Sequence, residues 1–119
     1  SGTRLLICTR LGWATGKQLG EKRSTVRQQV VLKCNIQRDD RNYVNWYKQV
    51  PGGVPQYVLS FRHYDSSLYF GTGFSSDRFN SKSTSSIDYQ FIIKQAEAGD
   101  SALYFCETWD DSAAEAVSQ

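Results

Sequence analysis

The sequence predicts an all-β fold in which two antiparallel sheets pack face to face. Short apolar/polar alternations recur from Val30 onward with turn residues between them, which is the pattern of half-buried strands. Two cysteines in such runs bracket a tryptophan in a third: Cys34, Trp46 and Cys106. A chain of 119 residues is long enough for one domain with a substantial core.

Each expected strand has its own alternation. The expected strands are residues 30–36, 43–49, 56–61, 78–82, 88–94 and 102–108. The clearest case is 88–94, where Tyr89, Phe91 and Ile93 share one face. The Pro-Gly-Gly of residues 51–53 predicts a hairpin turn. Residues 62–74, which are rich in Tyr, Ser and Gly, are expected to form a loop.

Both ends of the chain depart from this regularity. Residues 1–29 contain scattered glycines and no sustained period, so an earlier strand is at best expected at residues 24–26. We expect residues 1–20 to be an atypical N-terminal segment, mispredicted or disordered, and residues 21–119 to be the domain. Because no strand signal follows residue 108, we expect strand 102–108 to have an unpaired edge and the chain to be prone to aggregation.

The motifs around the two cysteines resemble those of immunoglobulin V-set domains, over roughly residues 26–111. They are Trp46-Tyr47-Lys48-Gln49-Val50-Pro51-Gly52, Ser76-Asp77-Arg78-Phe79 and Gly99-Asp100-Ser101-Ala102-Leu103-Tyr104-Phe105-Cys106. The resemblance implies a V-type Greek-key β-sandwich with a disulfide between Cys34 and Cys106. Strand G, the last strand of that fold, is expected to be missing or incomplete, because no Phe-Gly-x-Gly motif follows the second cysteine.

The resemblance also assigns structural roles. It places Trp46, Leu103 and Tyr104 in the core and pairs Arg78 with Asp100 at the base of the sandwich. The alternative for the last two is a solvated ion pair of little consequence.

A partner-domain interface is expected on one sheet face. The residues implied there are Tyr47, Gln49, Pro55, Tyr57 and Phe105. An aromatic patch on a sheet face is a usual mark of a protein interface, independently of the family. The alternative is that these side chains simply pack under loops.

Three segments are expected to form antigen-binding loops. The candidate residues are Arg38, Asp39, Asp40, Arg41, Asn42 and Tyr43 in the first, Arg62, His63, Tyr64, Asp65 and Tyr69 in the second, and Glu107, Trp109, Asp110 and Asp111 in the third. A mixture of Tyr, Ser and charged residues is typical of binding loops. Ordinary polar loops have a similar composition, so their expected position on the sandwich carries this interpretation.

Other classes of function are disfavoured. The formal net charge of +2 and the lack of a basic run argue against nucleic-acid binding, although basic residues exceed acidic ones in residues 1–33. His63 is the only histidine, and the paired acids 39–40 and 110–111 are adjacent loop residues. No phosphate-binding glycine loop and no zinc-ligand spacing occurs. We therefore expect no catalytic site, metal or cofactor.

The expected function is antigen recognition by a variable domain of an immunoglobulin light chain (lambda- or sigma-like), paired with a heavy-chain variable domain in adaptive immunity. The alternatives are a T-cell receptor gamma-type domain with a delta-type partner, a surrogate light chain, or an adhesion domain. The segment Cys106-Glu107-Thr108-Trp109-Asp110 is similar to the ends of lambda-type light-chain and T-cell receptor gamma V segments.

The disulfide implies an extracellular location, secreted or at the cell surface, with membrane attachment only through a partner or a constant region. No signal peptide is recognisable, and Cys8 has no expected partner.

The last two residues suggest an unrearranged gene segment. The heptamer of the recombination signal that follows a germline V segment can be read as Ser-Gln-stop, and the sequence ends Ser118-Gln119. A germline V segment translated through its own signal would explain the expected lack of strand G.

Overall fold

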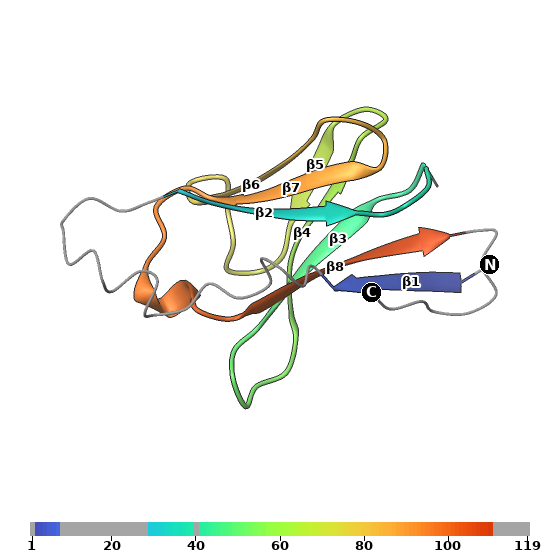
Figure 1. Ribbon diagram of the computed structural model, residues 1–119. Helices are drawn as coiled ribbons and strands as arrows, with labels where there is room; N and C mark the ends of the chain where they lie inside the picture. Colours follow the sequence, from blue (N-terminus) through green and yellow to red (C-terminus); the bar gives the residue numbers. More distant parts are fainter. Residues whose placement is uncertain (1, 8–28, 40, 111–119) are drawn as a thin grey trace.

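Two antiparallel sheets pack face to face in the computed structural model, which describes residues 2–7, 29–39 and 41–110 (Figure 1). The strands are β1 Gly2–Ile7, β2 Val30–Asn35, β3 Val44–Gln49, β4 Gln56–Arg62, β5 Ser67–Phe70, β6 Phe79–Ser83, β7 Asp88–Ile93 and β8 Leu103–Asp110, with a 3-10 turn η1 at Ala98–Asp100. One sheet has the order β1-β8-β3-β4-β5 and the other β2-β7-β6. The predicted all-β sandwich is confirmed. The strand expected at residues 24–26 lies outside the described residues.

Residues 67–70 form a strand inside the segment that we expected to be a loop. β5 pairs antiparallel with β4, from Arg62↔Ser67 to Leu59↔Phe70. A tight turn makes this possible, because Ser66 adopts a positive φ of 58° and Asp65 Oδ1 accepts a hydrogen bond from the backbone N–H of Ser67 at 3.1 Å. The loop prediction was wrong because it relied on the Tyr/Ser/Gly composition of this segment. Leu68 and Phe70 of the short strand pack against the core.

Glycine is required where β5 ends. A Cβ atom on Gly71 would lie 2.4 Å from the carbonyl oxygen of Tyr57, closer than any side chain tolerates. The backbone N–H of Gly71 instead donates to Val58 O at 2.7 Å. The bare backbone of Gly71 therefore lets the chain leave β5 while still in contact with β4.

The edge of β8 that we expected to be unpaired is covered. Residues 2–7, which we expected to lie outside the sandwich, form β1 and pair antiparallel with β8 from Gly2↔Asp110 to Ile7↔Phe105. β1 and β8 lie side by side in Figure 1. The expectation that this edge of β8 is unpaired was wrong, because it considered only strands that follow residue 108.

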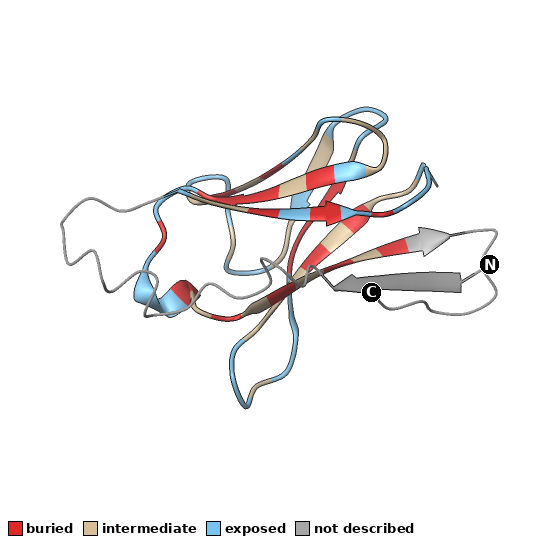
Figure 2. Cartoon of the chain, viewed as in Figure 1, coloured by how far each residue is buried: buried red, intermediate tan, exposed pale blue. Residues whose placement is uncertain are grey.

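The core follows the period of two along each strand. Ala102, Tyr104 and Cys106 are buried at every second position in and beside β8. Figure 2 shows buried and less buried positions alternating along β8. Leu103, which we expected in the core, is only partly buried because the same alternation turns it to the opposite face with Phe105. Trp46 is fully buried, and its ring stacks on Phe91 at a centroid distance of 5.0 Å.

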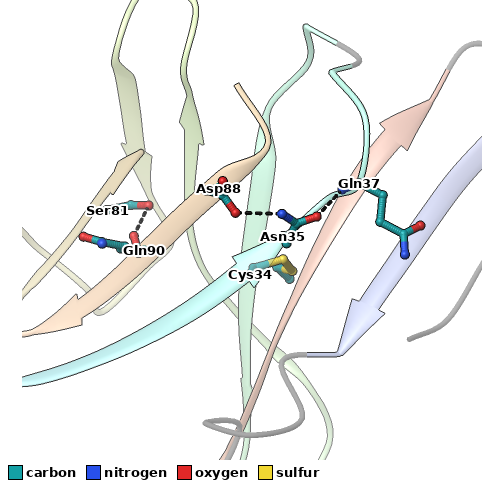
Figure 3. Close-up of a disulfide and its surroundings, with 7 residues drawn as sticks. Cys34, Asn35, Gln37, Ser81, Asp88 and Gln90 are labelled. Carbon is teal, nitrogen blue, oxygen red and sulfur yellow. Dashed lines mark hydrogen bonds between the residues drawn. A yellow bond between two sulfur atoms is a disulfide. The ribbon is translucent and has the colours of Figure 1, made fainter. Parts of the chain in front are cut away.

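A disulfide joins Cys34 of β2 to Cys106 of β8 and so links the two sheets (Figure 3). Polar contacts also stabilise the end of β2, directly after Cys34. The side-chain amide of Asn35 donates to Asp88 Oδ1 at 2.7 Å, and its carbonyl oxygen accepts from the backbone N–H of Gln37 at 2.8 Å. Gln37 turns the chain out of the sandwich with a positive φ of 74°. β2 is thus tied to β7 where the first loop begins.

Asp100 organises the opposite end of the sandwich. Its carboxylate is buried and accepts hydrogen bonds from Arg78 Nη2 and from the backbone N–H of Glu97, the latter at 2.7 Å. Its backbone carbonyl accepts from the hydroxyl of Tyr104 at 2.6 Å. The pair expected from the sequence is present, and it is more than a surface ion pair because the side chain of Asp100 is only 5% exposed.

Replacing Asp100 by Asn should lower the free energy of unfolding by about 2–3 kcal/mol, because Arg78 loses its buried carboxylate partner and keeps the more exposed Glu97 at 3.7 Å, and because the amide cannot accept both bonds equally well. Urea denaturation measures the change. Asp77→Asn is the matched control, since Asp77 is exposed, and it should change stability by less than about 0.5 kcal/mol. Equal effects of the two substitutions would contradict the role given to Asp100.

Candidate functional site

A continuous face of the five-stranded sheet points away from the core. The register of β3 and β8 places three side-chain pairs opposite one another: Asn45 with Glu107, Tyr47 with Phe105, and Gln49 with Leu103. All six side chains are partly buried, whereas their sequence neighbours Val44, Trp46, Tyr104 and Cys106 are fully buried on the other side. The six residues, together with Tyr57 of β4, are called the front face below.

Aromatic rings dominate the centre of the front face. Tyr47 stacks on Phe105 with ring centroids 5.3 Å apart and an interplanar angle of 12°. Tyr57 meets Tyr47 edge to face at 6.0 Å and is 37% exposed. Such aromatic arrangements add to the contact area that each ring supplies.

The two other predicted interface residues lie beside these rings. Gln49 donates through Nε2 to the carbonyl oxygen of Gly53 at 2.9 Å, which fixes its amide against the hairpin turn. Pro55 is exposed at the end of that turn, just before β4 begins. The structure therefore places the five predicted interface residues along β3, β4 and β8 and the turn between the first two.

A chain of hydrogen bonds holds the phenol groups of the front face. Glu107 Oε1 accepts from the hydroxyl of Tyr47 at 2.8 Å and from Asn45 Nδ2 at 3.2 Å. Asn45 Oδ1 accepts from Ser60 Oγ, whose oxygen is in contact with the hydroxyl of Tyr57. Because the Ser60 proton is used toward Asn45, Tyr57 is the donor in the last bond. The network spans β4, β3 and β8.

Sequence reasoning missed Asn45 and Ser60. The signal for Asn45 was available, because the period of two places it on the same face as Tyr47 and Gln49. Ser60 could not be placed in this way, since the pairing of β3 with β4 shifts register between Trp46 and Tyr47. Only the observed register brings the serine beside both Asn45 and Tyr57.

Glu107 was expected in the third loop but belongs to β8. The strand continues to Asp110, so Glu107, Trp109 and Asp110 are strand residues. The correction follows from pairing on both sides of β8, since β3 and β1 extend the ladder past residue 106. Asp111, the last residue predicted for this loop, lies outside the described residues.

The pKa of Tyr47 is raised from 10.0 to about 12. Burial of the phenol is the largest cause, and the hydrogen bond to Glu107 and the charge of that carboxylate act in the same direction. The neutral phenol is therefore the form that the front face holds.

The candidate antigen loops meet beside one end of the front face. The guanidinium of Arg62 lies 4.4 Å from the ring centroid of Tyr43 and 5.9 Å from that of Tyr64. It also binds both carboxylate oxygens of Asp65, at 2.7 and 3.1 Å. Tyr69 of β5 packs on Tyr43 with ring centroids 5.6 Å apart. The first and second predicted loops therefore share one cluster.

These contacts shift the titration of two groups in the cluster. The Arg62 guanidinium holds the pKa of the Asp65 carboxyl well below its usual range, with further help from hydrogen bonding by Ser67. Hydrogen bonding to Tyr43 raises the pKa of Tyr69. Asp65 is therefore charged and Tyr69 neutral over the physiological range.

A hollow of about 330 Å³ lies where this cluster meets the front face. It is lined by Asn42, Tyr43, Asn45, Ser60 and Tyr69. A second hollow of about 170 Å³ lies on the other side of the cluster, and its lining includes Asp39, Arg41 and His63. The lining of each hollow combines aromatic side chains with amide or charged ones, a mixture that suits contact with a polar side chain.

The remaining described candidates for the loops have hydrogen-bond partners other than Arg62, although Asp39, Arg41 and His63 line the same 170 Å³ hollow as Arg62. Arg38, Asp39 and Arg41 are exposed in the turn that follows β2, where Asp39 Oδ1 accepts from the backbone N–H of Arg41 at 2.9 Å. His63 is turned toward Ser83 of β6, with which it forms a hydrogen bond through Nδ1. Asp40 and Cys8 lie outside the described residues.

No group of three or more His, Cys, Asp or Glu side chains among residues 2–7, 29–39 and 41–110 is arranged to hold a metal ion. In the same part of the chain, no helix has the length and apolar character needed to cross a membrane.

The fold, the inter-sheet disulfide and the front face together define a variable-type β-sandwich domain. Residues 21–118 match the family model of the immunoglobulin V-set domain, and the chain therefore belongs to this family. Among curated relatives, human "T cell receptor gamma variable 4" is 27% identical over 94 residues, covering 76% of this chain and 80% of the relative. Human "T cell receptor beta variable 13" is 40% identical over 81 residues, covering 67% of this chain and 61% of the relative.

Solved structures show the same fold. A marsupial T cell receptor chain aligns with a TM-score of 0.68 at 20% identity, and the alignment covers 100% of this chain and 52% of that one. A second alignment to a marsupial T cell receptor has a TM-score of 0.63 and covers 79% of this chain and 46% of that chain. The present chain thus spans about half the length of these structures. The expected light-chain type stays a prediction.

The raised pKa of Tyr47 should make stability fall at alkaline pH. Because the folded state favours the neutral phenol, its contribution is fully present below about pH 10 and is lost as the pH rises through about 12. Denaturant titrations across this range should show a decline in the wild type that is smaller in Tyr47→Phe. Tyr57→Phe, its neighbour on the same face, is the control and should keep the decline. If Tyr47→Phe matched the wild type throughout, the ionisation of Tyr47 would not be the cause.

Proposed function

We propose that this chain is an antigen-recognition variable domain of T-cell-receptor type, which pairs through its front face with a second variable domain. The observation that carries the proposal is the aromatic centre of that face, in which Tyr47, Tyr57 and Phe105 lie together on an exposed sheet surface. The proposed partner is a delta-type variable domain, with a heavy-chain variable domain as the partner in the light-chain alternative, and the proposed ligand is an antigen.

The chemistry of the front face suits a protein partner. Interface centres are enriched in aromatic residues and depleted of charged ones. The one acidic side chain described on this face, Glu107, receives hydrogen bonds from Tyr47 and Asn45. The rings of Tyr47, Tyr57 and Phe105 are already fixed by their contacts with one another, so they would lose little conformational entropy on association.

The recognition role rests on the loop cluster around Arg62. Tyrosines with a charged or amide neighbour supply large contact area and directional hydrogen bonds, as binding loops do. The cluster and the 330 Å³ hollow adjoin the front face, so a partner docked there would bring its own loops close to them. Recognition by loops from two domains is the natural use of this arrangement.

The named relatives favour the T-cell-receptor type over the light-chain type. Human gamma and beta variable segments are similar to this chain over most of its V-set region. The motifs at residues 46–52 and 76–79 resemble both light chains and T-cell receptor chains, and the segment at residues 106–110, on which the light-chain expectation rests in part, is also similar to the ends of T-cell receptor gamma segments. The pairing partner therefore distinguishes the two.

The proposed location is the extracellular side of a membrane or the secreted phase. The Cys34–Cys106 disulfide persists in an oxidising compartment. Attachment to a membrane would be provided by a partner or by a constant region.

Co-expression with candidate partners tests the proposal. The chain should form a 1:1 complex with a T-cell receptor delta variable domain, measured by size-exclusion chromatography with light scattering. A complex with a heavy-chain variable domain alone would support the light-chain alternative. Self-association without either partner would support an adhesion domain and contradict the proposal.

Replacing Gln49 by Arg should weaken the complex by at least about tenfold, because it places an unpaired charge at the centre of the contact. Gln90→Arg is the matched control, since Gln90 is a partly buried glutamine on the outer face of β7 in the opposite sheet. Dissociation constants from surface binding compare the two. Equal weakening by both variants would place the contact elsewhere.

A further inference from the structure

Two neighbouring side chains hold the carboxylate of Glu107 through the same oxygen. Oε1 accepts hydrogen bonds from the hydroxyl of Tyr47 at 2.8 Å and from Asn45 Nδ2 at 3.2 Å. Within residues 29–39 and 41–110, no group donates a hydrogen bond to Oε2, and no lysine or arginine forms an ion pair with Glu107. The second oxygen of this carboxylate is therefore available to a binding partner.

Glu107 is the one carboxyl-bearing residue among the seven that define the front face. The other six are uncharged amide, phenol and apolar side chains, namely Asn45, Gln49, Tyr47, Tyr57, Leu103 and Phe105. No member of the front face can therefore neutralise the carboxylate. The side chain of Glu107 is partly exposed, so water can solvate the available oxygen while the domain is alone.

Docking of a second domain on the front face would remove this water from the carboxylate. Burial of a carboxylate is costly unless an opposite charge and hydrogen bonds replace the lost solvation. Neutral donors such as Tyr47 and Asn45 satisfy Oε1 but leave the negative charge in place. An arginine or lysine supplies a donor for Oε2 and a compensating charge together.

We infer that Glu107 selects the partner of this domain by the charge of one side chain: the variable domain that docks on the front face presents an arginine or lysine to Oε2. The inference rests on the pairing through this face proposed above, and it adds the chemical identity of one partner residue. A domain with a neutral or acidic residue at that place would leave the carboxylate desolvated and unpaired, and it would be rejected for this reason.

Replacing Glu107 by Gln tests the inference in complexes with a T-cell receptor delta variable domain and with a heavy-chain variable domain. The amide keeps a carbonyl oxygen that can accept from Tyr47 and Asn45, whereas the charge is removed. The dissociation constant of the complex that forms should rise about tenfold or more, because the partner's basic side chain loses its counter-charge. Unchanged or tighter binding of Glu107→Gln would overturn the inference.

Asp77→Asn is the matched control for the loss of one negative charge. Asp77 is exposed in the turn before β6, in the opposite sheet. Its replacement should change the dissociation constant less than about twofold, because an exposed charge away from the contact is screened by salt. Equal weakening by both variants would show an effect of net charge alone and would overturn the inference.

A double-mutant cycle identifies the partner residue. Each arginine and lysine on the front sheet of the partner domain is replaced by Gln, and every variant is measured against the wild type and against Glu107→Gln. One of these replacements should weaken binding to the wild type about tenfold or more and should have little further effect on binding to Glu107→Gln. If no basic residue of the partner is coupled to Glu107 in this way, the inference is wrong.

Gln49→Arg, measured on the same complexes, separates this inference from the proposed pairing. If Gln49→Arg weakens the complex and Glu107→Gln does not, pairing through the front face stands and the role given to Glu107 is overturned. If neither substitution weakens the complex, or if neither domain binds, the proposed pairing itself fails and the inference fails with it.

Discussion

The link between the two sheets through Cys34 and Cys106 is the constraint on which the rest of this structure depends. It joins β2 to β8, and Trp46 and Phe91 stack in the same core. In the chain-entropy model, a bridge across 72 positions stabilises the fold by roughly 4 kcal/mol. Because β8 is held against β2 on its inner side, its outer side is fixed as well. The alternation that buries Cys106 is the one that turns Phe105 and Glu107 to the front face.

Most of the sandwich could be predicted from the sequence because period-two alternation reflects burial directly. It identified the strands that became β2, β3, β4, β6, β7 and β8, with boundaries that differ by one or two residues. It failed where local composition and pairing disagree. β5 has loop-like composition and exists because Asp65, Ser66 and Gly71 set up its pairing with β4. β1 is defined only by its pairing with β8, which no local pattern encodes.

Most residues of the candidate site could be predicted from the sequence, whereas the hydrogen bonds between them could not. Tyr47, Tyr57 and Phe105 could be assigned to one face from strand periodicity. Their hydrogen bonds through Asn45 and Ser60 depend on a register shift between Trp46 and Tyr47 that the sequence does not reveal. Glu107 was predicted as a loop residue, and its place in the sheet follows from the continuation of β8 to Asp110. Leu103 was wrongly predicted in the core although the alternation of the strand argues against it, because a strand that buries Tyr104 turns Leu103 to the opposite face.

In the proposed recognition role, the structure of the cluster around Arg62 would affect the speed and selectivity of binding. An arginine side chain usually samples many rotamers, and only some of them are competent to bind a given ligand. Here Asp65 holds the guanidinium from one side while Tyr43 lies against its flat surface. A ligand of the proposed site would therefore meet a preformed arrangement of the Arg62 charge and the Tyr43 ring. Such a surface would favour ligands that fit the observed conformation of Arg62. Ligands that require the arginine to move would bind less well.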